Sequence, residues 1–124
     1  MRHRHKGKII DRKYAARKAL IKHLAESFIL YETIQTTTAK AKVTQPFVEK
    51  LVTIAKEPTL TNRRKLLELL GSRSRAVAKI LEVIAPRYKN VTGGVTRRIL
   101  TARRQGDNAQ LMQLSFIEPR ADKK

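Results

Sequence analysis

The first 23 residues of the chain are too densely basic to be buried in a protein core. Nine of them are Lys or Arg, and all three histidines of the chain lie there too, against a single acid, Asp11. Burying an unpaired cation is strongly unfavourable, and a solvated run of like charges repels itself unless a polyanion neutralises it. We therefore expect residues 1–10 to form a basic arm outside the core that binds a polyanion.

The charge of the whole chain indicates nucleic acid as that polyanion. The 124 residues include 28 Lys and Arg against 10 Asp and Glu, which gives a net charge of +18 and a pI near 11.0. A field of this size attracts phosphate backbones, and binding them releases counterions. Hydrophobic residues still make up 41% of the chain. This is enough for one folded domain, which we place at residues 11–118, with a flexible tail at 119–124.

The compartment is constrained by what the sequence lacks. There is no cysteine, which excludes disulfides and Cys-ligated zinc sites and fits a reducing compartment. The apolar runs are far shorter than the ~18 residues of a membrane-spanning helix. The Arg-rich start resembles a mitochondrial transit peptide, but it contains no Ser and leads directly into a core helix. We predict a cytoplasmic protein.

The basic stretch continues into a predicted helix, with Asp11 as its N-cap and Leu30 near its end. Lys13 and Arg17 occupy the first two turns of its inner face, so these turns should protrude beyond the core. The alternative is that Arg17 packs its stem along the core edge and keeps its charged head in water. Apolar residues continue the same face at helical spacing: Leu20, Ile21, Leu24, Ala25 and Phe28.

Three further helices are predicted from caps and periodicity. One begins at Thr37 or Thr38 and runs to about Lys56, with Phe47 on its apolar stripe. Pro46 lies inside it and either kinks the helix or marks its true start. Another begins at Thr61 and stops at Gly71, and the last begins at residue 74 and ends just before residue 86.

Three short strands complete the predicted fold. Residues 32–36 are rich in β-branched side chains, and residues 96–103 and 111–117 read as a hairpin joined by a turn at 105–108. We expect residues 106–108, which tolerate positive φ, to shape that turn, and Gly106 to need the backbone freedom of glycine. Met112, Leu114 and Phe116 alternate on one face, which should pack on the helices. The sequence thus predicts an α+β domain with about four helices on a sheet of about three strands.

No residue constellation favours catalysis or a cofactor. His3 and His5 are spaced like a metal pair, but no third ligand is near and the surrounding cations oppose a metal ion. Ser27, Ser72, Ser74 and Ser115 have no histidine close to them in the sequence, since all three histidines lie in or next to the arm, so nucleophilic catalysis is not indicated. We predict that the protein is not an enzyme and holds neither a metal nor another cofactor.

Basic residues also recur outside the arm, where the predicted helices and hairpin begin or turn. Helix N-termini add backbone N–H groups to the side-chain charge, which suits phosphate. Aromatic residues are few, and Phe28, Phe47 and Phe116 lie on predicted core stripes, so contact through phosphates and RNA shape is favoured over base stacking. A cluster at residues 63–65 is interpreted as a solvated surface. The residues predicted to bind RNA are Arg2, His3, Arg4, His5, Lys6, Lys8, Arg12, Lys13, Arg17, Lys18, Lys22, Thr36, Thr37, Lys40, Lys42, Arg97, Arg98, Arg103 and Arg104.

An ordered series of short motifs resembles a known family over nearly the whole chain, from Met1 to about Glu118. The series comprises Met1-Arg2-His3-Arg4, Arg12, Arg17, Thr36-Thr37-x-x-Lys40-Ala41-Lys42, Pro46-Phe47-Val48-Glu49, Asn62-Arg63-Arg64, Pro86-Arg87-Tyr88, Gly93-Gly94-x-Thr96-Arg97 and Arg104-x-Gly106-Asp107-Asn108-Ala109. Together they resemble the bacterial large-subunit ribosomal proteins of the L17 family. Val43, Gln45 and Val95 depart from the usual residues, which puts individual contacts in question.

The resemblance implies an α+β protein of the large ribosomal subunit, near the peptide exit side, that binds large-subunit rRNA without catalysis. Its partners would be that rRNA and neighbouring ribosomal proteins, in the cytoplasmic ribosome. Two other classes share the composition: a histone-like protein that compacts DNA, and a peripheral membrane protein with a basic amphipathic helix. The motif series favours the ribosomal interpretation over the DNA one. The membrane interpretation is weakened because the stripe from Leu20 to Phe28 is needed for the core.

Overall fold

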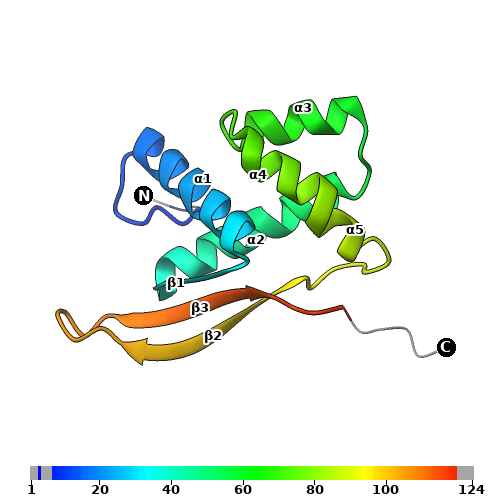
Figure 1. Ribbon diagram of the computed structural model, residues 1–124. Coiled ribbons are helices and arrows are strands. Elements are labelled where there is room, and N and C mark those ends of the chain that lie inside the picture. The colour runs from blue at the N-terminus through cyan, green and yellow to red at the C-terminus, as the bar shows by residue number, and fades with distance from the viewer. Residues whose placement is uncertain (1–2, 4–6, 120–124) are drawn as a thin grey trace.

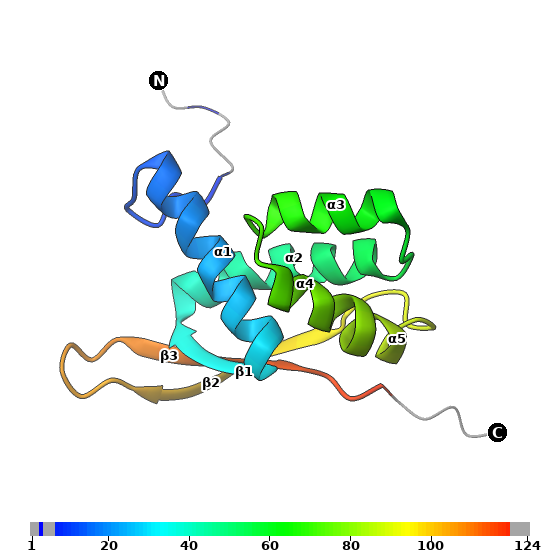
Figure 2. The ribbon, with the colours of Figure 1, turned by 45° about the horizontal axis from the view of Figure 1, so that its top comes forward.

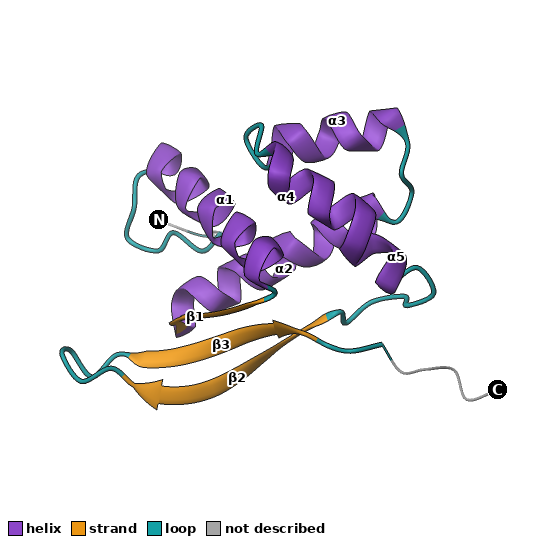
Figure 3. Ribbon diagram, viewed as in Figure 1, coloured by secondary structure: helices purple, strands orange, loops and turns teal. Residues whose placement is uncertain are grey.

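Helices form one layer of the molecule and a three-stranded sheet forms the other (Figures 1 and 3). The computed structural model describes residue 3 and residues 7–119. The elements, in chain order, are α1 (Tyr14–Tyr31), β1 (Thr33–Thr37), α2 (Thr38–Ala55), α3 (Leu60–Leu69), α4 (Ser74–Lys79), the π-helical segment η1 (Ile80–Ile84), α5 (Ala85–Arg87), β2 (Thr96–Arg103) and β3 (Gln110–Phe116). The predicted α+β class and the three strands are confirmed.

The sheet is antiparallel, in the order β1-β3-β2, so the last strand in the sequence is the central one. Leu114 of β3 is fully buried, and Met112 and Phe116 pack against the core. In β2 only the first residue, Thr96, is buried. The expectation that one sheet face packs on the helices therefore holds for β3 and is wrong for most of β2, because the hairpin extends past the helices (Figure 1).

Aromatic rings join the helices to the central strand. The rings of Phe28 and Phe116 are stacked, with centroids 4.5 Å apart and planes 7° apart. The centroid of the Tyr88 ring lies 5.9 Å from that of Phe116, and the Tyr88 hydroxyl donates a 2.6 Å hydrogen bond to the Ile117 carbonyl. Burial raises the pKa of the Tyr88 hydroxyl, so this donor keeps its proton at neutral pH. Two of the predicted core phenylalanines thus lie in the core.

Two helix starts differ from the predicted ones. Asp11 is not the N-cap of α1: the helix begins at Tyr14 after Lys13, and both Ile10 and Asp11 have positive φ values, 55° and 49°. A residue in this left-handed conformation cannot offer the extended geometry of an N-cap. In α3 the cap is Thr59 rather than Thr61, because the Thr59 hydroxyl accepts a hydrogen bond from the backbone N–H of Asn62.

Both prolines singled out in the sequence lie inside helical segments. Pro86 is in α5, directly after a π-helical segment, and does not lie past the helix end as predicted. Pro46 lies in the middle of α2 and does not mark its start. Because proline has no N–H, the carbonyl four residues earlier, at Lys42, lacks its usual helical donor. The Nζ of Lys8 donates to that carbonyl instead, at 3.2 Å, so the arm is joined to α2 at its base.

The end of α1 is fixed by an ion-pair cluster. Glu32 takes the left-handed C-cap conformation, with φ of 61°, and its N–H donates to the Phe28 carbonyl. Its carboxylate lies 2.8 Å from Arg87 Nη1 and 3.2 Å from Lys79 Nζ. The hydrogen bond from Arg87 lowers the pKa of Glu32, so its carboxylate stays ionised at neutral pH. These pairs connect α1 to α4 and α5.

Gly71, which ends α3 as predicted, needs its glycine backbone. Its φ is +67°, and a Cβ there would lie 2.9 Å from Nη1 of Arg73. We expect Gly71→Ala to lower the free energy of unfolding by about 1 kcal/mol or more, measured by urea denaturation. Gly93→Ala is the matched control, since a Cβ at Gly93 meets nothing within 4 Å. Equal midpoints for the two variants would contradict the assignment.

Candidate nucleic-acid interface

Four basic segments that are far apart in the sequence lie toward the same end of the molecule. They are the base of the arm, the first turns of α1, the start of α2 and the β2–β3 turn (Figures 1 and 2). Lys8 contacts α2 through the Lys42 carbonyl. The hydroxyl of Thr38, the first residue of α2, donates to the Gln110 carbonyl at the start of β3. We call this region the basic end, and among the described residues it comprises Lys8, Arg12, Lys13, Arg17, Lys18, Lys40, Lys42, Arg103 and Arg104.

The first turns of α1 protrude from the body, as predicted (Figure 2). Lys13, Tyr14 and Lys18 are exposed and Arg17 is half-buried. The Arg17 guanidinium lies over the Tyr14 ring, with its Cζ 5.6 Å from the ring centroid. The Nζ of Lys18 lies 5.9 Å from the same centroid. Tyr14, whose side chain is 70% exposed, was missed in the sequence because it lies outside the apolar stripe.

The base of the arm covers the start of α2. Lys8 and Ile10 line a shallow hollow of about 370 Å³ together with Thr38, Ala39, Lys42 and Val43. His3 is exposed. Arg2, Arg4, His5 and Lys6, which the sequence predicts to bind RNA, lie outside the described residues. The hollow therefore shows where the arm leaves the body, next to two lysines.

The start of α2 combines lysines with free backbone donors. Thr36 and Thr37 pair with β3, opposite Met112 and Leu111, and Thr37 is the N-cap of α2. Its hydroxyl makes no capping hydrogen bond. The first N–H groups of a helix have no partner within the helix and form the positive end of its dipole. Lys40 and Lys42 lie in the first two turns, so side-chain and backbone charges here favour the same ligand, an anion.

The hairpin turn has a positive φ at one of the three residues predicted to tolerate it, but the predicted need for glycine at residue 106 is wrong. The positive φ belongs to Asn108, at 56°, and not to Gly106, where a Cβ would meet nothing within 4 Å. Arg104 donates two hydrogen bonds to the Asp107 carboxylate, from Nε at 2.9 Å and from Nη2 at 2.7 Å. These bonds, with one from the Ala109 N–H, lower the pKa of Asp107 to about 2. Arg104 therefore holds the turn, and Arg103 beside it is exposed.

Three predicted residues lie away from the basic end. Arg97 and Arg98 are exposed at the start of β2, and Arg97 donates from Nε to the Ser115 hydroxyl at 3.3 Å. Lys22 is half-buried further along α1 and lines a groove against α3. No helix in the described part of the chain is long and apolar enough to cross a membrane. The same residues contain no cluster of three or more His, Cys, Asp or Glu that could hold a metal ion.

This arrangement agrees with what comparison with known proteins finds. The family described as ribosomal protein L17 matches residues 20–117, which include α1 from its second turn, both other long helices and the whole sheet. The chain belongs to the ribosomal protein L17 family. The predicted family is thus confirmed, and the chain is a structural ribosomal protein and not an enzyme.

Curated members of the L17 family resemble the chain over almost its whole length. The protein named large ribosomal subunit protein bL17 from Thermomicrobium roseum is 47% identical over 117 residues, covering 94% of this chain and 99% of the relative. The bL17 proteins of Hydrogenobaculum sp. and Persephonella marina are 42% and 44% identical, and each alignment covers 95% of this chain. The alignments cover 100% and 96% of these two relatives. The names of all three relatives place them in the large ribosomal subunit.

Proposed function

We propose that this L17-family protein is a structural constituent of the large ribosomal subunit that binds folded large-subunit rRNA through its basic end. The observation that carries the proposal is that four basic segments lie toward one end of a molecule with a net charge of +18. Neighbouring large-subunit proteins are the other expected partners, and the cytoplasmic ribosome is the expected location.

The chemistry of the basic end suits phosphates held in a fixed three-dimensional arrangement. Its cations come from a loop, two helices and a hairpin, so together they fit a folded polyanion better than a straight one. Arg and Lys contacts to phosphate position a protein without reading sequence. Shape and backbone contacts are also how proteins recognise structured RNA, whose deep major groove side chains cannot enter.

The two other classes that share this composition have less support. A DNA-compacting protein would use the same charges, but family membership places this chain in the ribosome. A peripheral membrane protein would need a free apolar face on the basic helix. Ala25, Phe28 and Ile29 of α1 are fully buried in the core, so that face is already occupied.

Competition between nucleic acids tests the proposal. Two triple variants that lose the same charge at different places separate the effect of the position of the cations from that of net charge. The wild-type protein should prefer deproteinised large-subunit rRNA to double-stranded DNA by about 10³-fold in filter binding. Changing Arg12, Lys13 and Arg17 together to Gln should weaken rRNA binding at least about tenfold. The matched control changes Arg63, Arg64 and Lys65 of α3, which are exposed and away from the basic end. Equal losses for the two triple variants would show that only net charge matters and would contradict a localised interface.

A further inference from the structure

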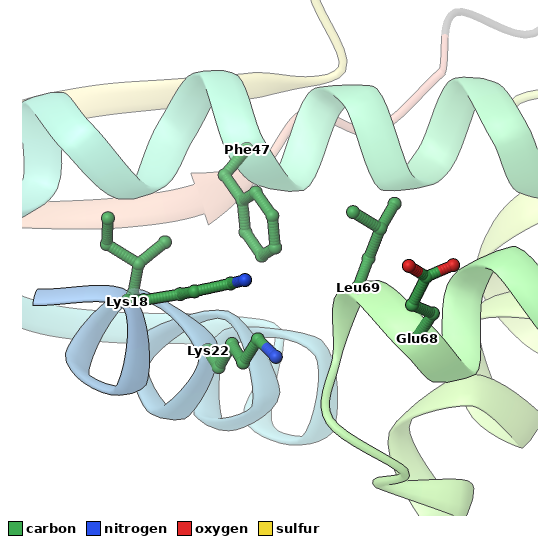
Figure 4. Close-up of a pocket in the computed structure, with 6 residues that line it drawn as sticks. Lys18, Lys22, Phe47, Glu68 and Leu69 are labelled. Carbon is green, nitrogen blue, oxygen red and sulfur yellow. The ribbon is translucent and has the colours of Figure 1, made fainter. Parts of the chain in front are cut away.

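A groove between three helices has the residues of a nucleotide pocket. It is about 180 Å³ in volume and is lined by Lys18, Ile21 and Lys22 of α1, Phe47 of α2, and Glu68 and Leu69 of α3. Figure 4 shows the Phe47 ring projecting from α2 into the space between α1 and α3, with the Lys18 side chain running beneath it. Phe47 was predicted to be a core residue, but it is only half-buried. Its ring packs against the core and also forms part of the groove wall.

The size of the groove restricts what can fill it. A water molecule takes about 30 Å³ in the liquid, so the groove has room for about six waters. Cofactors and drug-sized ligands need roughly 300–1,000 Å³. The volume of the groove suits one planar ring system of the size of a nucleobase better than a drug-sized ligand.

The polar groups at the rim select the chemistry of that ring system. Lys18 and Lys22 are one helical turn apart, so two like charges lie side by side, which is unfavourable without an anion near them. Lys22 lies close to Gly71, just after the end of α3. Its Cδ and Nζ would each be 3.5 Å from a Cβ atom added to that glycine. Glu68, on the opposite wall, can only accept hydrogen bonds when ionised. The rim thus offers cations for a phosphate and an acceptor for an amino or hydroxyl group.

The geometry points to a pocket for one unpaired nucleotide of the rRNA, an inference that rests on the proposed function. The base would stack on Phe47 between Ile21 and Leu69, its phosphate would lie against Lys18 and Lys22, and Glu68 would accept from the base edge or the ribose. An apolar side chain of a neighbouring protein would fill the same walls but would bring no anion to two ammonium groups that share one carboxylate, Glu68, on the groove wall. Lys18 also belongs to the basic end, so an RNA strand bound there continues directly to the groove.

Phe47→Leu tests the stacking contact, because it keeps an apolar side chain and removes the aromatic face. The control is Tyr31→Leu, which removes an exposed ring at the far end of α1. With deproteinised large-subunit rRNA as the probe, Phe47→Leu should bind about tenfold more weakly, and Tyr31→Leu should bind like the wild type. Base-specific chemical modification of that rRNA should show one nucleotide that the wild type and Tyr31→Leu protect and Phe47→Leu exposes.

The salt dependence separates the base contact from the phosphate contact and gives a test that does not depend on Phe47. Lys22→Gln should lower the slope of log K against log salt concentration by about one, while Phe47→Leu leaves the slope unchanged. Lys89→Gln, an exposed lysine after α5, is the matched charge control. Thermal melts of all variants exclude loss of fold as the cause.

Three results would overturn the inference, each in a distinguishable way. If the wild type does not bind the rRNA, the proposed function itself fails. If the wild type binds but Phe47→Leu and Lys22→Gln bind equally well with unchanged slopes, the function stands and the nucleotide pocket is wrong. If Phe47→Leu binds naked rRNA normally but is washed off large subunits by salt that retains Tyr31→Leu, the occupant is a protein side chain.

Discussion

Raising the salt concentration from about 50 to about 200 mM is expected to lower the affinity for large-subunit rRNA by roughly 10³–10⁵. This is the effect of neutralising about six to ten phosphates, because each neutralised phosphate releases counterions and adds about −0.9 to the slope of log K against log salt. The basic end alone supplies enough cations among the described residues. A filter-binding titration of the full chain with deproteinised large-subunit rRNA measures the slope directly.

The charge of Arg104 is already paired within the hairpin turn, which affects how much this residue contributes to the salt slope. The Nε and Nη2 atoms of Arg104 both donate to Asp107, whose low pKa keeps the carboxylate ionised at neutral pH. We therefore expect Arg104 to contribute less to the salt slope than Arg103, which is exposed beside it. A nearly flat salt dependence of the wild-type protein would rule out phosphate neutralisation as the main source of affinity.

The helices and strands could be predicted because their signals are local. The apolar residues from Leu20 to Phe28 recur at the spacing of an α-helix. Those around Leu114 alternate at the two-residue spacing of a strand. Helix starts were harder, because a cap depends on the conformation of one residue. Asp11 is a common cap residue, yet the chain turns through a left-handed conformation there, and no local pattern signals that.

The basic segments of the candidate site could be predicted from the sequence. Their arrangement in space could not, because it depends on contacts between distant parts of the chain. Lys8 and Lys42 are 34 positions apart, and Thr38 and Gln110 are 72 apart, but both pairs are in hydrogen-bonding contact. Such contacts depend on how the helices pack on β3. The same limit explains Phe47, whose place on a helical stripe indicates a buried face without showing that the neighbouring helices leave a groove beside it.

The buried side chains and the cations of the basic end therefore lie in largely different parts of the fold. The segment from α3 to α5 supplies many of the buried side chains, including Leu66, Val77 and Ile80, and packs them against α1, α2 and β3. The basic end carries cations on exposed turns and on the half of the hairpin that extends beyond the helices. Because the two regions share few residues, removing charge from one should leave the stability of the other intact.

Deleting residues 2–7 is expected to separate RNA binding from folding. The segment contains three cations, two imidazoles and a glycine, with no apolar side chain to bury. Lys8 is kept in this variant because its Nζ occupies the Lys42 carbonyl that Pro46 leaves without a helical donor. We expect the free energy of unfolding to change by less than about 0.5 kcal/mol, as for surface changes elsewhere.

The same deletion should weaken rRNA binding at least about tenfold, because losing several charge-assisted phosphate contacts outweighs the 1.4 kcal/mol that a factor of ten requires. A second variant, with the same six positions replaced by Gly and Ser, keeps the length and removes only the charge. Both variants should bind alike if the cations act through phosphates. Thermal melts and filter binding of the two proteins decide the matter: a much lower melting temperature would make the arm a structural element, and undiminished affinity would remove it from the interface.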